Sequence, residues 1–266
     1  MGGFELLLFT TDAAIVEEAG AAGIAGFVVD WERRGKEVRQ AGFDTQIGAD
    51  DAEDLRRVRA HTRARVVCRI NGVHEGTGDE VEEAVAAGVD ELLIPMVRRP
   101  EEVEAVLARV AGRAGVGILV ETVDAVARVD ALARLPLARI YVGLNDLAIE
   151  RGTGNLFEAV IDGTVERVRE AFAGPFGFAG LTLPEAGRPV PCKLLISEMA
   201  RLGASFTMLR RSFLRDTRGL PLAAHVPRIL AALEDAGRRA PERMRADQRE
   251  LARIVKEMGA GSLARA

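Results

Sequence analysis

Charged side chains follow directly on apolar runs at several points of this sequence. Glu121 comes after Ile118–Val120, and Asp146 lies just beyond Tyr141–Leu144. A carboxylate next to several apolar residues is costly to desolvate unless a cation, a metal ion or backbone N–H groups compensate it. Two carboxylates on adjacent strands, with positions left for water and substrate, suit Mg²⁺ or Mn²⁺, which prefer oxygen ligands. We therefore predict that Glu121 and Asp146 bind a divalent cation.

A structural interpretation of these two carboxylates carries equal weight at this point. One of them could cap the helix after its strand while the other pairs with an arginine. Arg69, which ends the run Val66–Cys68, bears on both interpretations. Its guanidinium could bind a substrate carboxylate or keto oxygen and stabilise a developing enolate, or it could neutralise Asp30 or Glu32. The two roles of Arg69 are compatible.

Asp30 and Glu32 follow another apolar run and lie two residues apart. In an extended chain such residues point to the same face, so the two carboxylates could order metal-bound water or hold Arg69. We place Asp30 among the substrate-binding residues, and Glu32 with Arg69 among the catalytic ones.

The remaining reactive residue types disfavour several chemistries. None of the histidines ends a predicted strand, where a zinc ligand is expected (His61, His74, His225). None of the lysines lies within a predicted strand, which disfavours a Schiff-base aldolase (Lys36, Lys193, Lys256). The cysteines lack the C-x-x-C spacing and are predicted to be structural thiols (Cys68, Cys192).

Short β-rich apolar runs alternate with stretches of helical period, the pattern of repeated βα units. Thr10-Thr11-Asp12 follows the first run in place of a glycine-rich phosphate loop, so we prefer a (β/α)8 TIM barrel over an open doubly wound sheet. In such a barrel the chemistry lies at the carboxyl ends of the strands. The eight expected strands are Glu5–Phe9, Gly26–Asp30, Arg65–Asn71, Glu91–Val97, Gly117–Glu121, Arg139–Gly143, Phe176–Leu181 and Ser205–Leu209.

A charged segment from Pro241 to Met258 follows the eighth pair. Its apolar residues lie near helical spacing, so we expect an additional C-terminal helix that is either solvated or, as we favour, packed on another subunit. The chain then divides into a barrel domain at residues 1–239 and a helical extension at 240–266 that serves as an oligomer contact.

Composition and charge narrow the class of function. With 48% hydrophobic residues the 266-residue chain can bury a sizeable core, and its net charge of −4 gives no basic surface for nucleic acid. The run Leu6–Phe9 is too short for a secretory signal or a membrane span. We expect a cytoplasmic protein that acts on small molecules, with neither nucleic acid nor membrane as partner.

Five motifs, in order along the chain, resemble those of the HpcH/HpaI aldolase and citrate lyase β-subunit family. The resemblance covers residues 5–215 and implies a phosphoenolpyruvate-type TIM barrel, a divalent metal, and cleavage or formation of a carbon–carbon bond through a pyruvate-like or acyl-CoA enolate. The motifs are V-V-D-W-E at Val28–Glu32, C-R-I-N at Cys68–Asn71, I-P-M-V at Ile94–Val97, V-E-T at Val120–Thr122 and G-L-N-D-L at Gly143–Leu147.

The resemblance also assigns roles to single residues. It implies that Glu121 and Asp146 are the metal ligands, that Arg69 holds the enolate oxygen, and that the backbone around Asn145 and Asp146 receives the substrate carboxylate. It further implies a homo-oligomer, since members of this family commonly pack a terminal helix on a neighbouring subunit in trimers or hexamers.

The sequence departs from both branches of this family at the acid–base position. Pyruvate aldolases read D-x-E-H where this chain has Arg33, which stays protonated near neutral pH and cannot act as a base. Their partner aspartate and glutamine are Ala86 and Leu119 here. The citrate lyase branch reads D-x-E-D, and it has P-K where this chain has Pro95-Met96.

We predict a metal-dependent, class II aldolase-type carbon–carbon lyase acting on a 2-oxoacid. Its proton transfer would use metal-bound water, Glu32 or a carboxylate from a neighbouring subunit. One alternative is an acyl-CoA lyase or thioesterase of the citrate lyase type. The other is a barrel that binds metal and anion but has lost turnover.

Overall fold

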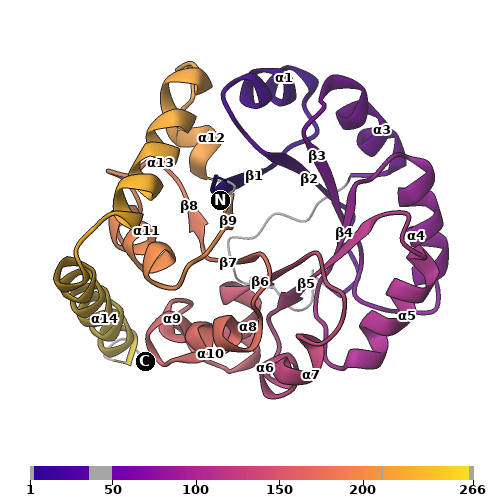
Figure 1. The fold of residues 1–266 in the computed structure, drawn as a ribbon. Helices are drawn as coiled ribbons and strands as arrows, with labels where there is room; N and C mark the ends of the chain where they lie inside the picture. Colours follow the sequence, from indigo (N-terminus) through magenta and orange to yellow (C-terminus); the bar gives the residue numbers. More distant parts are fainter. Residues whose placement is uncertain (1–2, 36–49, 211, 264–266) are drawn as a thin grey trace.

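The computed structural model of the protein describes residues 3–35, 50–210 and 212–263, so the outermost ends of both predicted domains lie outside it. The described residues form one parallel sheet that curls into a barrel, with helices around its outside (Figure 1). The strand order is β7-β6-β5-β4-β3-β2-β1-β9-β8. The strands are β1 (Glu5–Phe9), β2 (Gly26–Asp30), β3 (Arg65–Arg69), β4 (Glu91–Ile94), β5 (Gly115–Val120), β6 (Arg139–Val142), β7 (Phe176–Phe178), β8 (Gly180–Leu181) and β9 (Phe206–Leu209).

Alternation along each strand sorts side chains between the barrel interior and the layer under the helices. We call the inward-facing set the interior cluster; its members are Leu7, Val28, Val67, Leu93, Leu119, Tyr141, Phe206 and Met208. The outward-facing residues pack with the helices in a second, larger cluster. Both faces of the strands are therefore buried, which explains why the strands read as continuous apolar runs.

One wall segment of the barrel consists of two short strands, β7 and β8, in place of a single strand. β7 pairs with β6 and β8 pairs with β9, and Ala179 between them has φ +50°, which is rare for alanine. The Ala179 carbonyl accepts hydrogen bonds from the hydroxyls of Tyr141 (2.6 Å) and Thr207. The predicted single strand Phe176–Leu181 is thus two short strands. The barrel is nearly closed, and the predicted TIM-barrel fold is confirmed.

Three helices begin at residue types that favour a helix start. Asp12 accepts hydrogen bonds from the first amides of α1, Asp51 forms a capping box with Asp54 at α3, and Pro100 opens α5. The helices are α1 (Ala13–Ala21), α3 (Ala52–His61), α4 (Thr77–Ala86), α5 (Pro100–Val110), α6 (Val123–Ala127), α7 (Val129–Leu132), α8 (Leu144–Glu150), α9 (Glu158–Ile161), α10 (Thr164–Ala171), α11 (Cys192–Arg201), α12 (Ser212–Asp216), α13 (Leu222–Gly237) and α14 (Pro241–Leu263). Within the described ranges, no helix is both long and apolar enough to cross a membrane.

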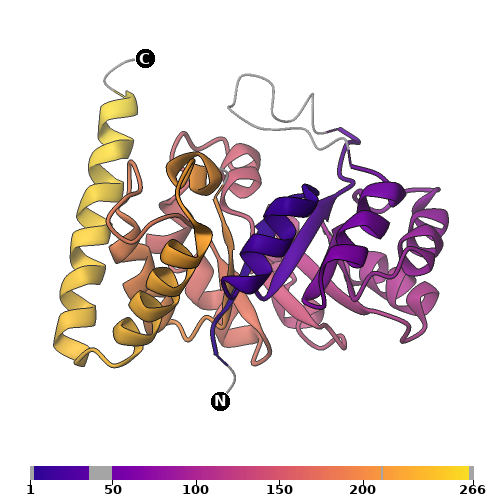
Figure 2. The ribbon, with the colours of Figure 1, turned by 90° about the horizontal axis from the view of Figure 1, so that it is seen from above.

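The C-terminal helix α14 runs along the side of the barrel, beside α11 and α9 (Figures 1 and 2). Leu251 and Val255 are buried there, and the Asn155 side-chain amide donates to the Val255 carbonyl (2.7 Å). Two residues of the apolar stripe are therefore covered by the barrel of the same chain. An oligomer contact through the rest of α14 stays a prediction.

A buried ion-pair network lies at the amino-terminal end of the strands. The Arg139 side chain is 2% exposed; its Nε lies 2.6 Å from Glu91 Oε1 and its Nη1 lies 3.2 Å from Glu5 Oε2. Arg65 Nη1 lies 2.9 Å from the same Glu5 oxygen, and the Arg65 side chain is partly exposed. The network fills the end of the barrel opposite the expected site.

Candidate active site

Arg69 ends β3 and points toward the carboxyl ends of the strands, which we call the mouth. Its Nε and Nη2 donate to the two Asp30 oxygens at 2.9 and 2.7 Å, and its Nη1 lies 3.3 Å from Glu32 Oε2. Burial opposes the charge, but these carboxylates raise the pKa of the guanidinium above its usual range. Asp30 and Glu32 therefore hold Arg69, which is one of the two roles that the sequence predicts for them.

Glu121 follows β5 and is 2% exposed. Its Oε1 accepts a hydrogen bond from the Met96 amide at 2.9 Å, and its other oxygen lies against Gly143, where a Cβ would come within 2.2 Å. Burial is the largest cause that raises the pKa of Glu121, and the charges of Asp146 and Glu32 raise it further. The resulting pKa is about 8. The side chain thus lies between the ends of β4 and β6, near the carboxylates of Asp146 and Glu32.

The capping alternative for Glu121 is wrong. Thr122 caps α6 instead, because its hydroxyl accepts a hydrogen bond from the Ala125 amide at 3.0 Å. Asp146 lies in the first turn of α8, immediately after β6, and is buried; Asn145 beside it is partly exposed. The structure thus places Asp30, Glu32, Arg69, Glu121, Asn145 and Asp146 at the ends of neighbouring strands.

The donor set of this site fits a hard divalent cation. Glu121 and Asp146 are both buried, and the charge of Asp146 disfavours ionisation of Glu121, so a cation between the two carboxylates would relieve their repulsion. Among the residues described, no three His, Cys, Asp or Glu side chains gather as ligands. Water and substrate oxygens would therefore complete the coordination, as Mg²⁺ usually requires.

Arg33 stands outside this cluster. Its guanidinium is exposed and donates to the Asp50 carbonyl, while its backbone amide donates to Asn71 Oδ1 at 2.8 Å. Asn71 donates in turn to Glu80 (2.7 Å), which also pairs with His74 (2.9 Å). His74 is therefore held in a network of polar contacts.

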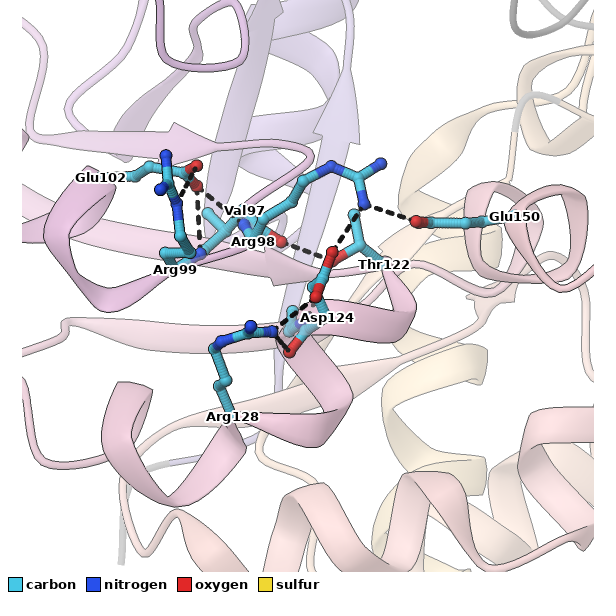
Figure 3. A network of polar contacts seen from close by, with 9 residues as sticks. Val97, Arg98, Arg99, Glu102, Thr122, Asp124, Arg128 and Glu150 are labelled. Carbon is cyan, nitrogen blue, oxygen red and sulfur yellow. Dashed lines mark hydrogen bonds and ion pairs between the residues drawn. The ribbon is translucent and has the colours of Figure 1, made fainter.

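A polar network joins the loop after β4 to α6 and to the end of α8 (Figure 3). Arg98 Nη1 donates to Asp124 at 3.1 Å and to Glu150 at 2.6 Å. The Thr122 hydroxyl donates to the Val97 carbonyl at 2.6 Å. Asp124 follows Glu121 by three residues and Glu150 ends α8, so the network ties the segments that carry Glu121 and Asp146 to the loop after β4. The sequence carried no signal for these pairings.

Arg210 is a mouth residue that sequence reasoning missed. It follows β9, and its Nε donates to the Gly180 carbonyl at 2.7 Å. The alternation of the predicted strand Ser205–Leu209 extends to Arg210 and could have identified it.

A nearly closed parallel barrel surrounded by helices, with acidic and basic residues at its strand ends, defines a protein of the TIM-barrel class. The particular family follows from the sequence. Residues 6–159 match the HpcH/HpaI aldolase/citrate lyase family, and the chain belongs to it. This is a family of carbon–carbon lyases whose members generally depend on a divalent metal.

Two solved structures illustrate the likeness of fold. A crystal structure of an HpcH/HpaI aldolase from Desulfitobacterium hafniense DCB-2 has a TM-score of 0.61 and 16% identity, covering 80% of this chain and 89% of that one. A crystal structure of the citrate synthase SbnG has a TM-score of 0.60 and 18% identity, with the same coverage. No curated protein shows a significant match to the sequence.

Proposed function

We propose that the protein is a divalent-metal-dependent carbon–carbon lyase of the aldolase type, working through a pyruvate-like enolate. The observation that carries the proposal is the pair of buried carboxylates Glu121 and Asp146, whose mutual repulsion a divalent cation would relieve. Membership of a lyase family supports the same reaction class.

Each site residue has a role in this proposal. Glu121 and Asp146 would hold Mg²⁺ or Mn²⁺, which acts as a Lewis acid on the 2-oxo group when bound. Arg69, fixed by Asp30, binds the oxygen on which enolate charge develops, so no reorganisation is needed when the charge appears. The backbone at Asn145 and Asp146 receives the substrate carboxylate, as the family resemblance implies.

Proton transfer falls to Glu32 in this scheme. Its carboxylate is buried, lies 3.3 Å from Arg69, and acts electrostatically on Glu121, so it stands inside the site. In the cleavage direction Glu32 accepts the proton of the substrate 4-hydroxyl as the C3–C4 bond breaks and the aldehyde leaves. The bonding electron pair passes into the enolate, and return of that proton to C3 gives pyruvate.

The direct test is pyruvate release from 4-hydroxy-2-oxoacids by the purified protein with Mn²⁺, followed by a coupled NADH assay. We expect a rate above that of free Mn²⁺ at the same concentration. Cleavage of acyl-CoA esters, with 4-hydroxy-2-oxoacids left untouched, would contradict the proposal and favour the citrate lyase alternative.

A methyl group at residue 143 is expected to displace the Glu121 carboxylate. A Cβ on Gly143 would lie 2.2 Å from Glu121 Oε2, while the Gly143 φ of −82° suits alanine, so the effect is steric alone. We expect Gly143→Ala to weaken Mn²⁺ binding by about tenfold or more in calorimetric titrations. The matched control is Gly72→Ala, also at the mouth, where the nearest atom is 3.6 Å away. Equal losses in both variants would count against the Glu121 assignment.

Metal binding is expected to depend on pH. Glu121, whose pKa is raised to about 8, must lose its proton before it can coordinate a cation. The association constant for Mn²⁺ should therefore rise by about tenfold per pH unit below 8 and level off above it. Titrations at pH 6.0, 7.0 and 8.5 measure this, and a flat profile would show that Glu121 is not a ligand.

A further inference from the structure

The backbone on both sides of Glu32 is hydrogen-bonded to the end of β3. Before Glu32, the Trp31 amide donates to the Arg69 carbonyl at 2.9 Å, which extends the β2–β3 ladder by one residue. After Glu32, the amides of the next two residues both donate to Asn71 Oδ1, at 2.8 and 2.9 Å. The first contact belongs to the sheet, whereas the second depends on a single side chain.

The Asn71 side chain is buried, and its contacts define the orientation of its amide. Asn71 Nδ2 donates to Glu80 Oε1 at 2.7 Å, and the Asn71 backbone amide donates to the other Glu80 oxygen at 3.1 Å. A carboxylate accepts hydrogen bonds and cannot donate them. Glu80, in the first turn of α4, therefore selects the orientation in which the Asn71 amide oxygen faces the chain after Glu32.

Glu80 is itself held by the loop before α4. His74 Nε2 lies 2.9 Å from Glu80 Oε1, and His74 Nδ1 accepts a hydrogen bond from the Gly76 amide at 2.9 Å. Because Nδ1 accepts, the imidazole proton lies on Nε2 and is donated to Glu80. A series of contacts thus runs from the start of α4 through Glu80 and Asn71 to the chain after Glu32.

The proposed role of Glu32 requires a well-placed carboxylate. Glu32 is 1% exposed, and its Oε2 lies 3.3 Å from Arg69 Nη1. A general base must lie within hydrogen-bond reach of the proton that it accepts, and a displacement of about 1 Å can cost about a hundredfold in rate. A lost contact in the backbone that carries Glu32 should therefore slow proton transfer.

We propose that Asn71 is a positioning residue for Glu32: its amide oxygen holds the chain just after Glu32, and Glu80 fixes the direction of that amide. This inference rests on the proposed function for the role of Glu32 in proton transfer. Arg69 lies within the β2–β3 ladder and is held by Asp30. Loss of the Asn71 contact should therefore disturb proton transfer and spare the binding of the 2-oxoacid end of the substrate.

Amide hydrogen exchange of the metal-free protein, measured residue by residue by NMR, tests the contact itself. In Asn71→Ala, the amides of Arg33 and Arg34 lose their acceptor and should exchange about tenfold faster or more. The Trp31 amide keeps the Arg69 carbonyl as its acceptor and is the internal control, expected within about twofold of wild type. Unchanged exchange at Arg33 and Arg34 overturns the inference.

Deuterium exchange at C3 of pyruvate in the presence of Mn²⁺ measures proton transfer. Calorimetric titration with oxalate, a planar mimic of the enolate, counts the intact sites and gives their affinity. We expect Asn71→Ala to lower the exchange rate per oxalate-binding site by about tenfold to a hundredfold, with the oxalate affinity within about twofold of wild type. A merely structural role would lower the number of oxalate sites and the exchange rate in proportion, and that result overturns the inference.

Two substitutions of nearly equal volume provide a rescue experiment. Asn71→Asp sets a carboxylate against Glu80, and Glu80→Gln sets a donor against the Asn71 amide nitrogen, so each should slow proton transfer. In the double variant the glutamine amide donates to the aspartate, which still accepts from the two backbone amides. We expect its rate per site to lie within about fivefold of wild type. A double variant no faster than the slower single variant overturns the inference.

Asn155→Ala is the matched control. Asn155 is also buried, accepts a hydrogen bond from the Phe157 amide at 3.2 Å and donates to the Val255 carbonyl at 2.7 Å, beside α14. Its removal should leave the rate of pyruvate deuterium exchange per oxalate site within about twofold of wild type. A loss equal to that of Asn71→Ala would show that any buried asparagine has this effect, and would overturn the inference.

The lyase proposal and the Asn71 inference can fail separately. Pyruvate release by wild type, together with proton transfer that ignores Asn71, overturns the inference alone. A wild type that binds oxalate but leaves the pyruvate protons unexchanged overturns the lyase proposal. Faster amide exchange at Arg33 and Arg34 in Asn71→Ala would in that case still support Asn71 as the residue that holds the chain after Glu32.

Discussion

Glu121→Gln is expected to abolish metal-dependent turnover, with a loss on the order of a thousand-fold or more, because it removes one of the two proposed charged ligands. The same variant should make the metal-free protein more stable at alkaline pH. Both effects have one cause, the buried charge of Glu121 beside Asp146 and Glu32. Few substitutions at a structural glutamate would combine these two outcomes.

The sign of the stability effect follows from proton binding. Glu121 ionises at its ordinary pKa of 4.5 when unfolded and at about 8 when folded, so between these values the folded state holds the extra proton. Its stabilising contribution is complete below pH 4.5 and is lost as pH rises through 8. Glutamine does not ionise, and the variant therefore escapes this loss.

Thermal unfolding in EDTA and with Mn²⁺ measures the prediction. In EDTA at pH 8.5, Glu121→Gln should unfold at a higher temperature than wild type, and the gap should narrow toward pH 5. Mn²⁺ should stabilise wild type but not the variant. Glu17→Gln, which removes an exposed glutamate paired with His61, is the control and should behave as wild type. A metal effect retained in Glu121→Gln would contradict the assignment.

Arg139→Met is expected to lower the free energy of unfolding by about 3–5 kcal/mol. The substitution leaves Glu91, which is buried and 2.6 Å from Arg139, without its main counter-charge. Burial already raises the pKa of Glu91, and Arg139 is the first of the groups that lower it. Without Arg139 the carboxyl should be protonated more readily, so the loss should be larger at pH 8 than at pH 5.5.

Urea unfolding at the two pH values tests this prediction, with Arg65→Met as the matched control. Arg65 pairs with Glu5 in the same network but is 36% exposed, so its removal should cost no more than about 1 kcal/mol. Replacing Glu91 as well as Arg139 by apolar residues should recover part of the loss, because no orphaned charge remains. Similar losses for Arg65→Met and Arg139→Met would show that burial does not govern the network.

The strands were predictable because both of their faces are buried. β1 and β2 have the predicted bounds, and the others agree within a few residues at their ends. The break at Ala179 was not predictable, since no glycine or proline marks it at that residue. It depends on hydroxyl groups of Tyr141 and Thr207, which come from other strands and meet Ala179 only in the folded barrel.

The candidate site was predictable where strand ends alone define it. Glu121, Asp146 and Arg69 follow apolar runs, and the fold brings them to one end of the barrel. The significance of Asn71 was not readable in the same way, because it depends on what its side-chain amide contacts in the folded barrel. The apolar stripe of α14 likewise has a period that cannot distinguish its own barrel from a neighbouring one.

The break at Ala179 makes the backbone pairing on the two sides of the barrel wall different. On the side that carries Glu121 and Asp146, β4, β5 and β6 are joined by uninterrupted ladders, so continuous backbone pairing sets the spacing of the segments that hold these two residues. On the opposite side, Gly180 follows the discontinuity directly and anchors Arg210 through its carbonyl. Glu121 and Asp146 thus stand on the part of the barrel wall whose backbone pairing is continuous, away from the interruption at Ala179.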